Sequence, residues 1–216
     1  MRILSQGDIL FILAATRWTL LLSLVAFVGG GIGGLLVALA RTGDIKWLRW
    51  AMIGYIKVFQ GTPLLMQLFL AFFVPGIFNV NVDPWGAAAL GLSLNASAFL
   101  GEIWRGSIEV VPRGQVEAAR SLGLGYALRM VLVVIPQAFR IAIPPTIGFL
   151  VQLVKGTSLA SIIGFVELTR AAQIINNATF RPFTIFALVG VVYFLICWPL
   201  SLYSKAMERN LAVASR

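Results

Sequence analysis

The chain has 216 residues, of which 59% are hydrophobic and only 12% are charged, and its mean hydropathy is +0.92. A soluble domain carries about 25% charged residues, so a water-soluble fold of this size could not bury so much apolar surface. The net charge of +9 would suit a nucleic-acid-binding protein, but the cations gather at the ends of apolar runs, as in membrane proteins. With no histidine and one cysteine, the sequence excludes an intrachain disulfide and offers almost no ligands for a transition metal.

The first apolar run covers residues 18–40 and lies between Arg17 and Arg41. It is free of charge and long enough to cross about 30 Å of hydrocarbon, which predicts a first membrane span. A secretory signal peptide is the alternative, because Ala38-Leu39-Ala40 is similar to a cleavage site, but such peptides have an apolar stretch of only about 7–15 residues. Glycines at 29–31, 33 and 34 form small-xxx-small pairs, which predict close helix packing.

Four more spans are predicted along the chain. Residues 53–74 end at a Pro-Gly pair, which stops a helix, and residues 85–104 begin at a tryptophan suited to the membrane interface. Residues 105–136 are amphiphilic and predict a water-facing loop with helical pieces. Residues 141–163 contain prolines and a lysine and predict a broken or tilted span, whereas the charge-free run 182–204 predicts a regular one.

The fold class predicted is an all-α integral membrane protein with about five transmembrane helices in a single domain, residues 1–216. Eleven cations fall on one side of the alternating loops: Arg41, Lys46, Arg49, Arg105, Arg113, Arg120, Arg129, Arg140, Lys205, Arg209 and Arg216. Only four fall on the other side: Arg2, Arg17, Arg170 and Arg181. The positive-inside rule therefore predicts an external N-terminus and a cytoplasmic C-terminus and central loop.

The central loop contains a spaced motif. Glu117-Ala118-Ala119 is followed after three residues by Gly123, and after nine more by Val133-Val134-Ile135-Pro136. This pattern resembles the cytoplasmic EAA loop of the permease subunits of binding-protein-dependent ABC importers, with conservative apolar changes at 133 and 135. Four other fragments resemble the polar amino acid (histidine/glutamine/glutamate-type) branch of that family: Gly61-Thr62-Pro63-Leu64-Leu65, Glu102-Ile103-Trp104-Arg105-Gly106, Pro112-Arg113-Gly114-Gln115 and Lys155-Gly156-Thr157-Ser158-Leu159.

The loop has a physical interpretation of its own. A short helix over 114–122, ended by a glycine at 123 that can adopt positive φ, would project from the membrane domain. Its alanines would keep one face thin enough to enter a groove on a partner, where Glu117 could pair with a basic group. The alternative is a solvated glutamate beside Arg113 or Arg120, a contact of about 0.2–0.5 kcal/mol. This short helix is the predicted coupling helix. The residues predicted to connect it to an ATPase are Arg113, Gln115, Glu117, Ala118, Ala119 and Gly123.

Polar residues within the predicted spans are candidates for a substrate pathway, because ionisable and polar groups are costly in lipid. They are Gln67, Asn95, Ser97, Gln152, Lys155, Thr157 and Ser158. Interhelical hydrogen bonds explain many such residues, and Lys155 has the alternative of reaching toward the interface. Transporters of cationic or polar amino acids in the resembling family often carry an acid about one and a half turns before this lysine. Gly148 and Phe149 stand there instead, which weakens a prediction of cationic substrate.

The resemblance implies a permease in the bacterial cytoplasmic (inner) membrane that works by alternating access, is not itself an enzyme and holds no cofactor. No phosphate-binding loop is present in the sequence, so ATP and Mg²⁺ would bind two partner ATPase subunits. Further expected partners are a second permease chain, identical or homologous, an extracytoplasmic solute-binding protein, lipid and an amino acid, with no nucleic acid. The alternatives are a secondary transporter or channel subunit, which would need membrane carboxylates, and a membrane enzyme, for which no nucleophile with a base is evident.

Overall fold

The computed structural model describes residues 4–214, with side chains described as far as residue 211. Within this part of the chain all regular elements are helical and no strand is present, which confirms the predicted all-α class. The α-helices are α1 (Gln6–Thr42), α2 (Lys46–Gly61), α3 (Leu64–Ile77), α4 (Pro84–Glu109), α5 (Arg113–Ser121), α6 (Tyr126–Arg129), α7 (Ile135–Gly156), α8 (Leu168–Thr179) and α9 (Pro182–Ala214).

Within the described residues, four helical segments are long and apolar enough to cross a bilayer: α1, α4, Tyr126–Ile163 and most of α9. Helices α2 and α3 have 16 and 14 residues and are each too short to span alone. They pass the same test only together, as a pair bent by 104°. Counting this pair as one span gives five, the number expected from the sequence. The predicted span 53–74 is therefore not one straight helix; the chain turns sharply at residues 62–63.

Two helices start or end differently from the predicted spans. The predicted first span starts at residue 18, whereas α1 begins at Gln6. The reason is a capping box: Ser5 Oγ accepts a hydrogen bond from the Asp8 N–H at 3.3 Å, and the Asp8 carboxylate accepts one from the Ser5 N–H at 2.9 Å. Arg17 thus lies inside the helix. At the other end of the chain α9 runs beyond the predicted 204 to Ala214.

The segment predicted as a broken span at 141–163 belongs to a longer irregular helix. The segment enters through α6 and one π-helical turn, Met130–Val134, continues as α7, and ends as 3-10 turns over Thr157–Ile163. Pro136 lies where the π-helical turn joins α7, and because proline has no N–H to donate to the preceding turn, it interrupts the regular hydrogen-bond ladder there. The helical start therefore precedes the predicted boundary by about four turns.

The closest helix pair is α1 and α4. A Cβ added to Gly30 would lie 2.3 Å from the Cβ of Ala96, and one added to Gly34 would lie 2.9 Å from the Cβ of Leu100. On α4, a Cβ at Gly101 would lie 2.5 Å from Val37 Cγ1. Glycine is required at these positions because the two backbones touch, which confirms the predicted close packing of the glycine-rich stretch.

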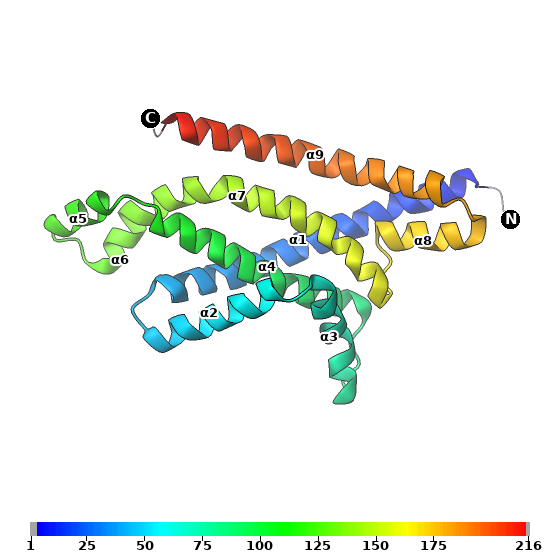
Figure 1. Cartoon of the computed structure of the whole chain (residues 1–216), viewed down its shortest axis with the longest axis horizontal. Helices are drawn as coiled ribbons and strands as arrows, with labels where there is room; N and C mark the ends of the chain where they lie inside the picture. Colours follow the sequence, from blue (N-terminus) through cyan, green and yellow to red (C-terminus); the bar gives the residue numbers. More distant parts are fainter. Residues whose placement is uncertain (1–3, 215–216) are drawn as a thin grey trace.

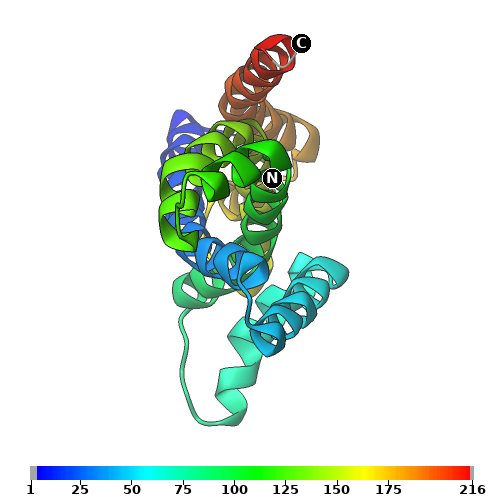
Figure 2. The same ribbon diagram turned by 90° about the vertical axis from the view of Figure 1, so that its left-hand side faces the viewer.

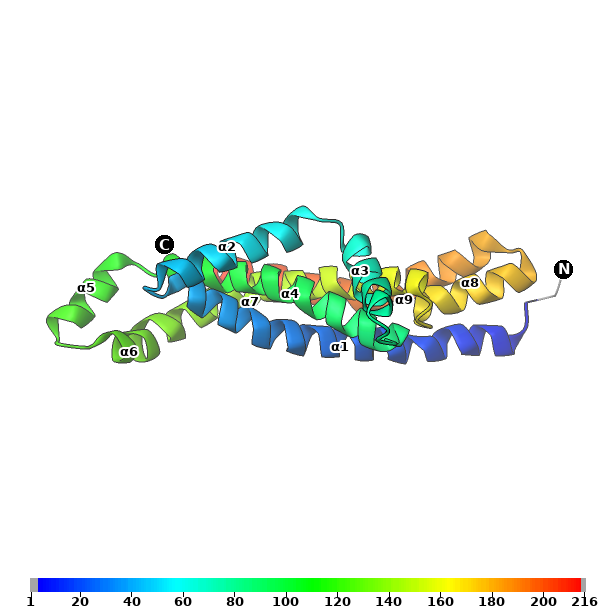
Figure 3. The same ribbon diagram turned by 90° about the horizontal axis from the view of Figure 1, so that it is seen from below.

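The long helices run side by side, and α3 projects sideways from them (Figures 1 and 2). Figure 3 shows α5, α6, the α1–α2 turn and the C-terminal end of α9 gathered at one end of the molecule, with α8 and the start of α1 at the other. The predicted cytoplasmic segments therefore lie at the same end. Which side of a membrane that end faces stays a prediction of the positive-inside rule.

Candidate functional site

The break between α2 and α3 is built by Gly61-Thr62-Pro63. Thr62 is extended (φ −112°, ψ 145°), because a residue before proline avoids the helical region, and α3 begins after Pro63. The break frees backbone carbonyls, which must be satisfied inside a membrane. Gln67 does this: its Nε2 donates to the carbonyl oxygens of Phe59 at 2.8 Å and Thr62 at 3.1 Å, and to Thr62 Oγ1 at 2.9 Å.

Asn95 ties this break to α4. Its Nδ2 donates to Gln67 Oε1 at 2.9 Å, and both side chains are buried. The amide of Gln67 is thus used on both its oxygen and its nitrogen, as a buried amide requires. Gln67 was predicted as a pathway residue. In the structure it does not line the cavity described below; it hydrogen-bonds the backbone of the break and Asn95.

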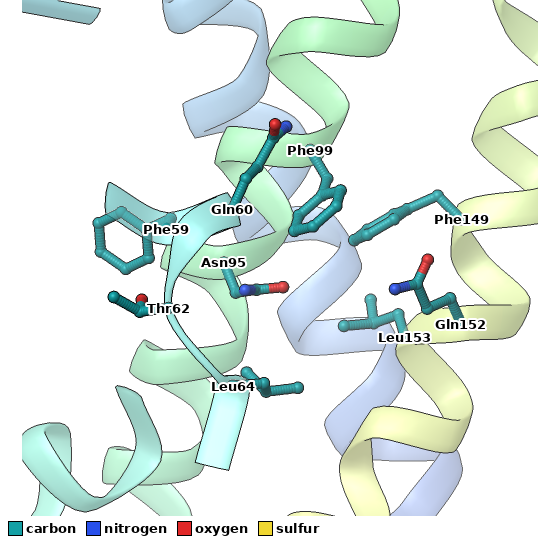
Figure 4. A pocket seen from close by; sticks show the side chains of 9 residues that line it. All are labelled: Phe59, Gln60, Thr62, Leu64, Asn95, Phe99, Phe149, Gln152 and Leu153. Carbon is teal, nitrogen blue, oxygen red and sulfur yellow. The ribbon is translucent and has the colours of Figure 1, made fainter. Parts of the chain in front are cut away.

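A cavity of about 160 Å³ opens beside the break. Its walls come from the end of α2, the start of α3, α4 and α7, and Figure 4 shows Asn95 and Gln152 extending into the space between these elements. Phe99 and Phe149 stack across one side, with ring centroids 5.4 Å apart. The lining residues are Phe59, Gln60, Thr62, Leu64, Asn95, Phe99, Phe149, Gln152 and Leu153.

The chemistry of the cavity is polar but uncharged. Three carboxamides and one hydroxyl provide donors and acceptors, and a carboxamide can donate to a carboxylate or accept from an ammonium. No ionisable side chain is part of the described lining. Such a cavity suits a small zwitterion better than a ligand with a net charge, which would need an opposite charge when desolvated.

The structure brings together only part of the predicted pathway set. Asn95 and Gln152 line the cavity, whereas the Ser97 hydroxyl lies 2.6 Å from Tyr55 Oη and serves packing between α2 and α4. Thr157 is fully buried and donates to the Val154 carbonyl. The side chain of Lys155 is exposed, and the Ser158 hydroxyl donates to the Lys155 carbonyl.

Of the nine lining residues, the predicted pathway set contained only Asn95 and Gln152, and it missed Gln60 and Phe99 among others. Gln60 follows from the break, because a polar residue beside a Gly-Thr-Pro interruption lies next to unwound backbone. Phe99 lies one helical turn beyond Asn95 on α4, so it shares that face. The sequence positions of Gln60 and Phe99 therefore indicate a place in the cavity, but only after α2 is known to end at Gly61.

The short helix predicted in the central loop is present as α5, Arg113–Ser121. Gly123 has φ +77°, and its N–H bonds to the Arg120 carbonyl at 2.9 Å, while the Leu124 N–H bonds to the Ala119 carbonyl at 3.1 Å. These two bonds are a Schellman turn, which ends a helix at glycine. The predicted positive φ at position 123 is confirmed.

One face of α5 is fixed to the bundle and the other is free. Val116 packs against an apolar cluster that includes Val111 and Val134. Ala119 was predicted for the face toward a partner, but it is buried within the chain, so of the two alanines only Ala118 is open to a partner. Glu117 and Ala118 are exposed, as are Arg113 and Gln115. Within the described residues no ion pair involves Glu117, so this exposed glutamate is solvated and is not held by Arg113 or Arg120.

Arg105 stabilises the end of α4, from which the chain enters α5. Its guanidinium donates two hydrogen bonds to Glu102, from Nε to Oε2 at 2.9 Å and from Nη2 to Oε1 at 2.5 Å. It also forms an ion pair with Glu109. Arg41 of α1 lies 3.9 Å from the same Glu102. Nearby, Trp104 Nε1 donates to Thr146 Oγ1 at 2.9 Å, which links α4 to α7.

Known proteins match nearly the whole chain. The model of the binding-protein-dependent transport system inner membrane component matches residues 30–213. The L-cystine transport system permease protein TcyB of Bacillus subtilis (strain 168) is 40% identical over 195 residues, which are 90% of this chain and 83% of that protein. The arginine transport system permease protein ArtQ of the same organism is 32% identical over 202 residues, 93% and 92% of the two chains.

Solved structures show the same fold. A chain in the crystal structure of an amino acid ABC transporter with histidines superposes with a TM-score of 0.89 at 33% identity, covering 97% of this chain and all of that chain. The MetNI methionine ABC transporter in an inward-facing conformation gives a TM-score of 0.79 at 18% identity, covering 96% and 99%. The chain therefore belongs to the family of binding-protein-dependent transport system inner membrane components, and it is a multi-pass protein of the inner membrane.

Proposed function

We propose that this chain is the transmembrane permease subunit of an ATP-driven amino acid importer, coupled to ATPase subunits through α5. The observation that carries the proposal is the exposed Glu-Ala-Ala helix, fixed to the bundle on one face and free on the other. The relatives support the amino acid class, because the names of the curated proteins specify cystine, arginine and glutamine transport. ATP and Mg²⁺ would bind two partner subunits and not this chain.

The structure offers a physical route from α5 to the cavity. α5 is followed by α6, which opens the long helical segment Tyr126–Ile163. Phe149, Gln152 and Leu153 on that segment form one wall of the cavity, whereas α2 and α4 form the other. A displacement of α5 by an ATPase would tilt one wall against the other, and ATP would act through its different affinity for the two arrangements.

We infer a substrate without net charge, because the cavity offers carboxamides and no described ionisable group. Phe149 occupies the region where an acid would be needed for a cationic amino acid. An extracytoplasmic solute-binding protein would deliver the substrate. A second permease chain, identical or homologous, would complete the pathway, since many of the apolar side chains of α1, α3 and α9 are exposed in this chain.

The first test is to purify the tagged chain in mild detergent and to measure uptake after reconstitution with the subunits that accompany it. We expect nucleotide-binding subunits to be recovered and uptake to stop when ATP is depleted. Recovery without such subunits, or uptake that follows an ion gradient in the absence of ATP, would contradict the proposal. A screen of amino acids against the cognate binding protein would then identify the substrate.

A sharper test compares two glycines. In Gly123→Ala the left-handed residue costs about 1–2 kcal/mol, so we expect the Schellman turn to loosen and ATP-coupled uptake to fall about tenfold. Gly125→Ala is the matched control: Gly125 has φ −62° and open space around it, so uptake should not change. Glu117→Gln should also lower coupled uptake, with the melting temperature unchanged. Equal coupling in all three variants would remove α5 from the mechanism.

The secondary transporter alternative needs a carboxylate that binds and releases an ion. Among the described residues two acidic side chains are buried, Asp8 and Glu167, and both cap helices. Glu167 accepts hydrogen bonds from the N–H groups of Thr169 and Arg170, each at 2.8 Å, and from Tyr193 Oη at 3.0 Å. Burial raises the pKa of this carboxyl, and these donors oppose the rise. Both carboxylates thus have a structural role.

A further inference from the structure

A second polar pocket lies at the end of the molecule that carries α5. It has a volume of about 370 Å³ and is lined by four arginines from four different helices: Arg41 of α1, Arg49 of α2, Arg113 of α5 and Arg129 of α6. Its single acidic lining residue is Glu109, which Arg105 already binds. The pocket therefore has a strong excess of positive charge.

Two of these arginines have donors that the protein does not satisfy. Arg129 is only 8% exposed, and among the described residues it makes no hydrogen bond and no ion pair; it lies 5.6 Å from the centre of the Tyr126 ring. Arg41 pairs with Glu102 at 3.9 Å through its Nη2, but its Nε is buried without a hydrogen-bond partner in the described structure. A buried donor is normally paired, because leaving it without an acceptor is costly. The pocket is thus built for an anion.

An apolar groove of about 560 Å³ adjoins this pocket between α1, α4 and α7. Ile108 lines both spaces. The groove wall is almost entirely hydrocarbon, and its one hydroxyl, on Thr146, is occupied by Trp104. A ligand that fits both spaces must have an anionic head and a long apolar tail.

We propose that the arginine pocket and the groove together bind one anionic phospholipid. Its phosphate would lie between Arg129 and Arg41, since guanidinium groups bind phosphate with paired hydrogen bonds, and one acyl chain would lie along the groove. Basic pockets between helices near the cytoplasmic face take such headgroups. The bound lipid would join the ends of α1 and α2 to α5 and α6. The site requires only that the chain lie in a membrane, so it does not depend on coupling to an ATPase.

Native mass spectrometry of the purified full chain tests the site, with dioleoyl phosphatidylglycerol compared against dioleoyl phosphatidylcholine. Wild type should retain phosphatidylglycerol preferentially. Arg49 and Arg113 are exposed, and Arg49→Gln and Arg113→Gln should each lower the preference about fivefold. Because Arg49 also donates to the Gly43 carbonyl at 2.7 Å, Arg113→Gln is the variant expected to leave the fold unchanged. Arg209→Gln is the matched control, because Arg209 is also exposed and does not line the pocket, and it belongs to the last turns of α9, whose C-terminal end lies toward this end of the molecule (Figure 3).

A groove variant and a soluble anion separate the possible sources of the phosphate. A Cβ at Gly31 would meet Trp104 at 3.7 Å, an ordinary contact, so Gly31→Leu should fill part of the groove and lower phosphatidylglycerol retention without lowering the melting temperature. Inorganic phosphate should not displace the lipid. Equal retention of the two lipids, displacement by inorganic phosphate, or an unchanged preference in both arginine variants would overturn the proposal. A further result would also overturn it: the arginine variants keep their lipid preference but no longer retain an ATPase subunit. That result would indicate that a carboxylate of the partner protein occupies the pocket.

Discussion

Two helix pairs of the membrane domain are packed in opposite ways: α1 with α4, and α2 with α3. In the first pair, glycines and small side chains bring the backbones into contact, and the interface holds many of the buried residues of the largest apolar cluster. In the second pair few residues are buried, namely Ile56, Gln67 and Leu68, and most of the surface is open. The bend of 104° lies in this open region.

This difference in packing indicates that the α1–α4 pair is the rigid part of the molecule and that the α2–α3 pair is the part that can adapt. Backbone contact between α1 and α4 leaves no room for either helix to move against the other, since packed interiors are not continuously deformable. The α2–α3 break instead depends on side chains for its hydrogen bonds: the buried amide of Gln67 and the Thr62 hydroxyl, which donates to the Val58 carbonyl at 2.7 Å. The cavity lies at the junction of the two regions, with Asn95 on the rigid side and Gln60 on the adaptable side.

The largest effect is expected at the rigid pair. Gly30→Ala places a Cβ 2.3 Å from the Cβ of Ala96, so the helices must separate, and we expect a loss of about 3 kcal/mol in the free energy of unfolding. Thermal or denaturant unfolding in detergent measures this. Gly54→Ala on α2 is the control, because nothing lies within 4 Å of its Cβ. A loss of the same size in both variants would show that the two pairs do not differ in packing.

A smaller effect is expected at the break. Gln67→Leu keeps the volume but leaves the carbonyls of Phe59 and Thr62 without the donors that they have in the structure, which should cost about 2 kcal/mol. The same unfolding measurement applies, and uptake should fall with it. If Gln67→Leu lowered uptake with no change in unfolding, then Gln67 would contact the substrate directly, as the sequence alone predicted.

The smallest effect is expected at the cavity wall. Gln152→Leu removes a carboxamide that is exposed and has no hydrogen bond among the described residues, so the unfolding free energy should not change. The loss of one substrate hydrogen bond, about 1 kcal/mol, should raise the KM for uptake about fivefold. Unchanged uptake kinetics would place the substrate elsewhere, on a partner permease or in another part of the pathway.

The sequence predicted the elements that have local signals. Charge-free runs located α4 and α9, and the Glu-Ala-Ala motif with Gly123 located α5 and its left-handed end. The start of α1 was missed although Ser5 and Asp8 form a capping box, because a charge-free window stops at Arg17. The division of 53–74 was missed because hydropathy does not register a Gly-Thr-Pro interruption, whose effect is on backbone geometry.

The cavity was harder to predict, because its walls combine the α2–α3 break with α4 and α7, which are distant from it in sequence. Asn95 and Gln152 were found by asking which polar residues lie in apolar runs. That criterion also selected Ser97 and Thr157, whose hydroxyls bond within the protein. Only the packing distinguishes a side chain that donates to a carbonyl from one that faces open space.

The length of α1 has a consequence for the shape of the protein in a bilayer. Its 37 residues make a rod of about 55 Å, against about 30 Å of hydrocarbon. Part of the helix must extend beyond the lipid tails or lie steeply tilted. The turns near Ile12 and Ala15 pack with α8 and α9 in a separate apolar cluster, so the end of the molecule opposite α5 has its own small core and can hold its shape without support from the bilayer.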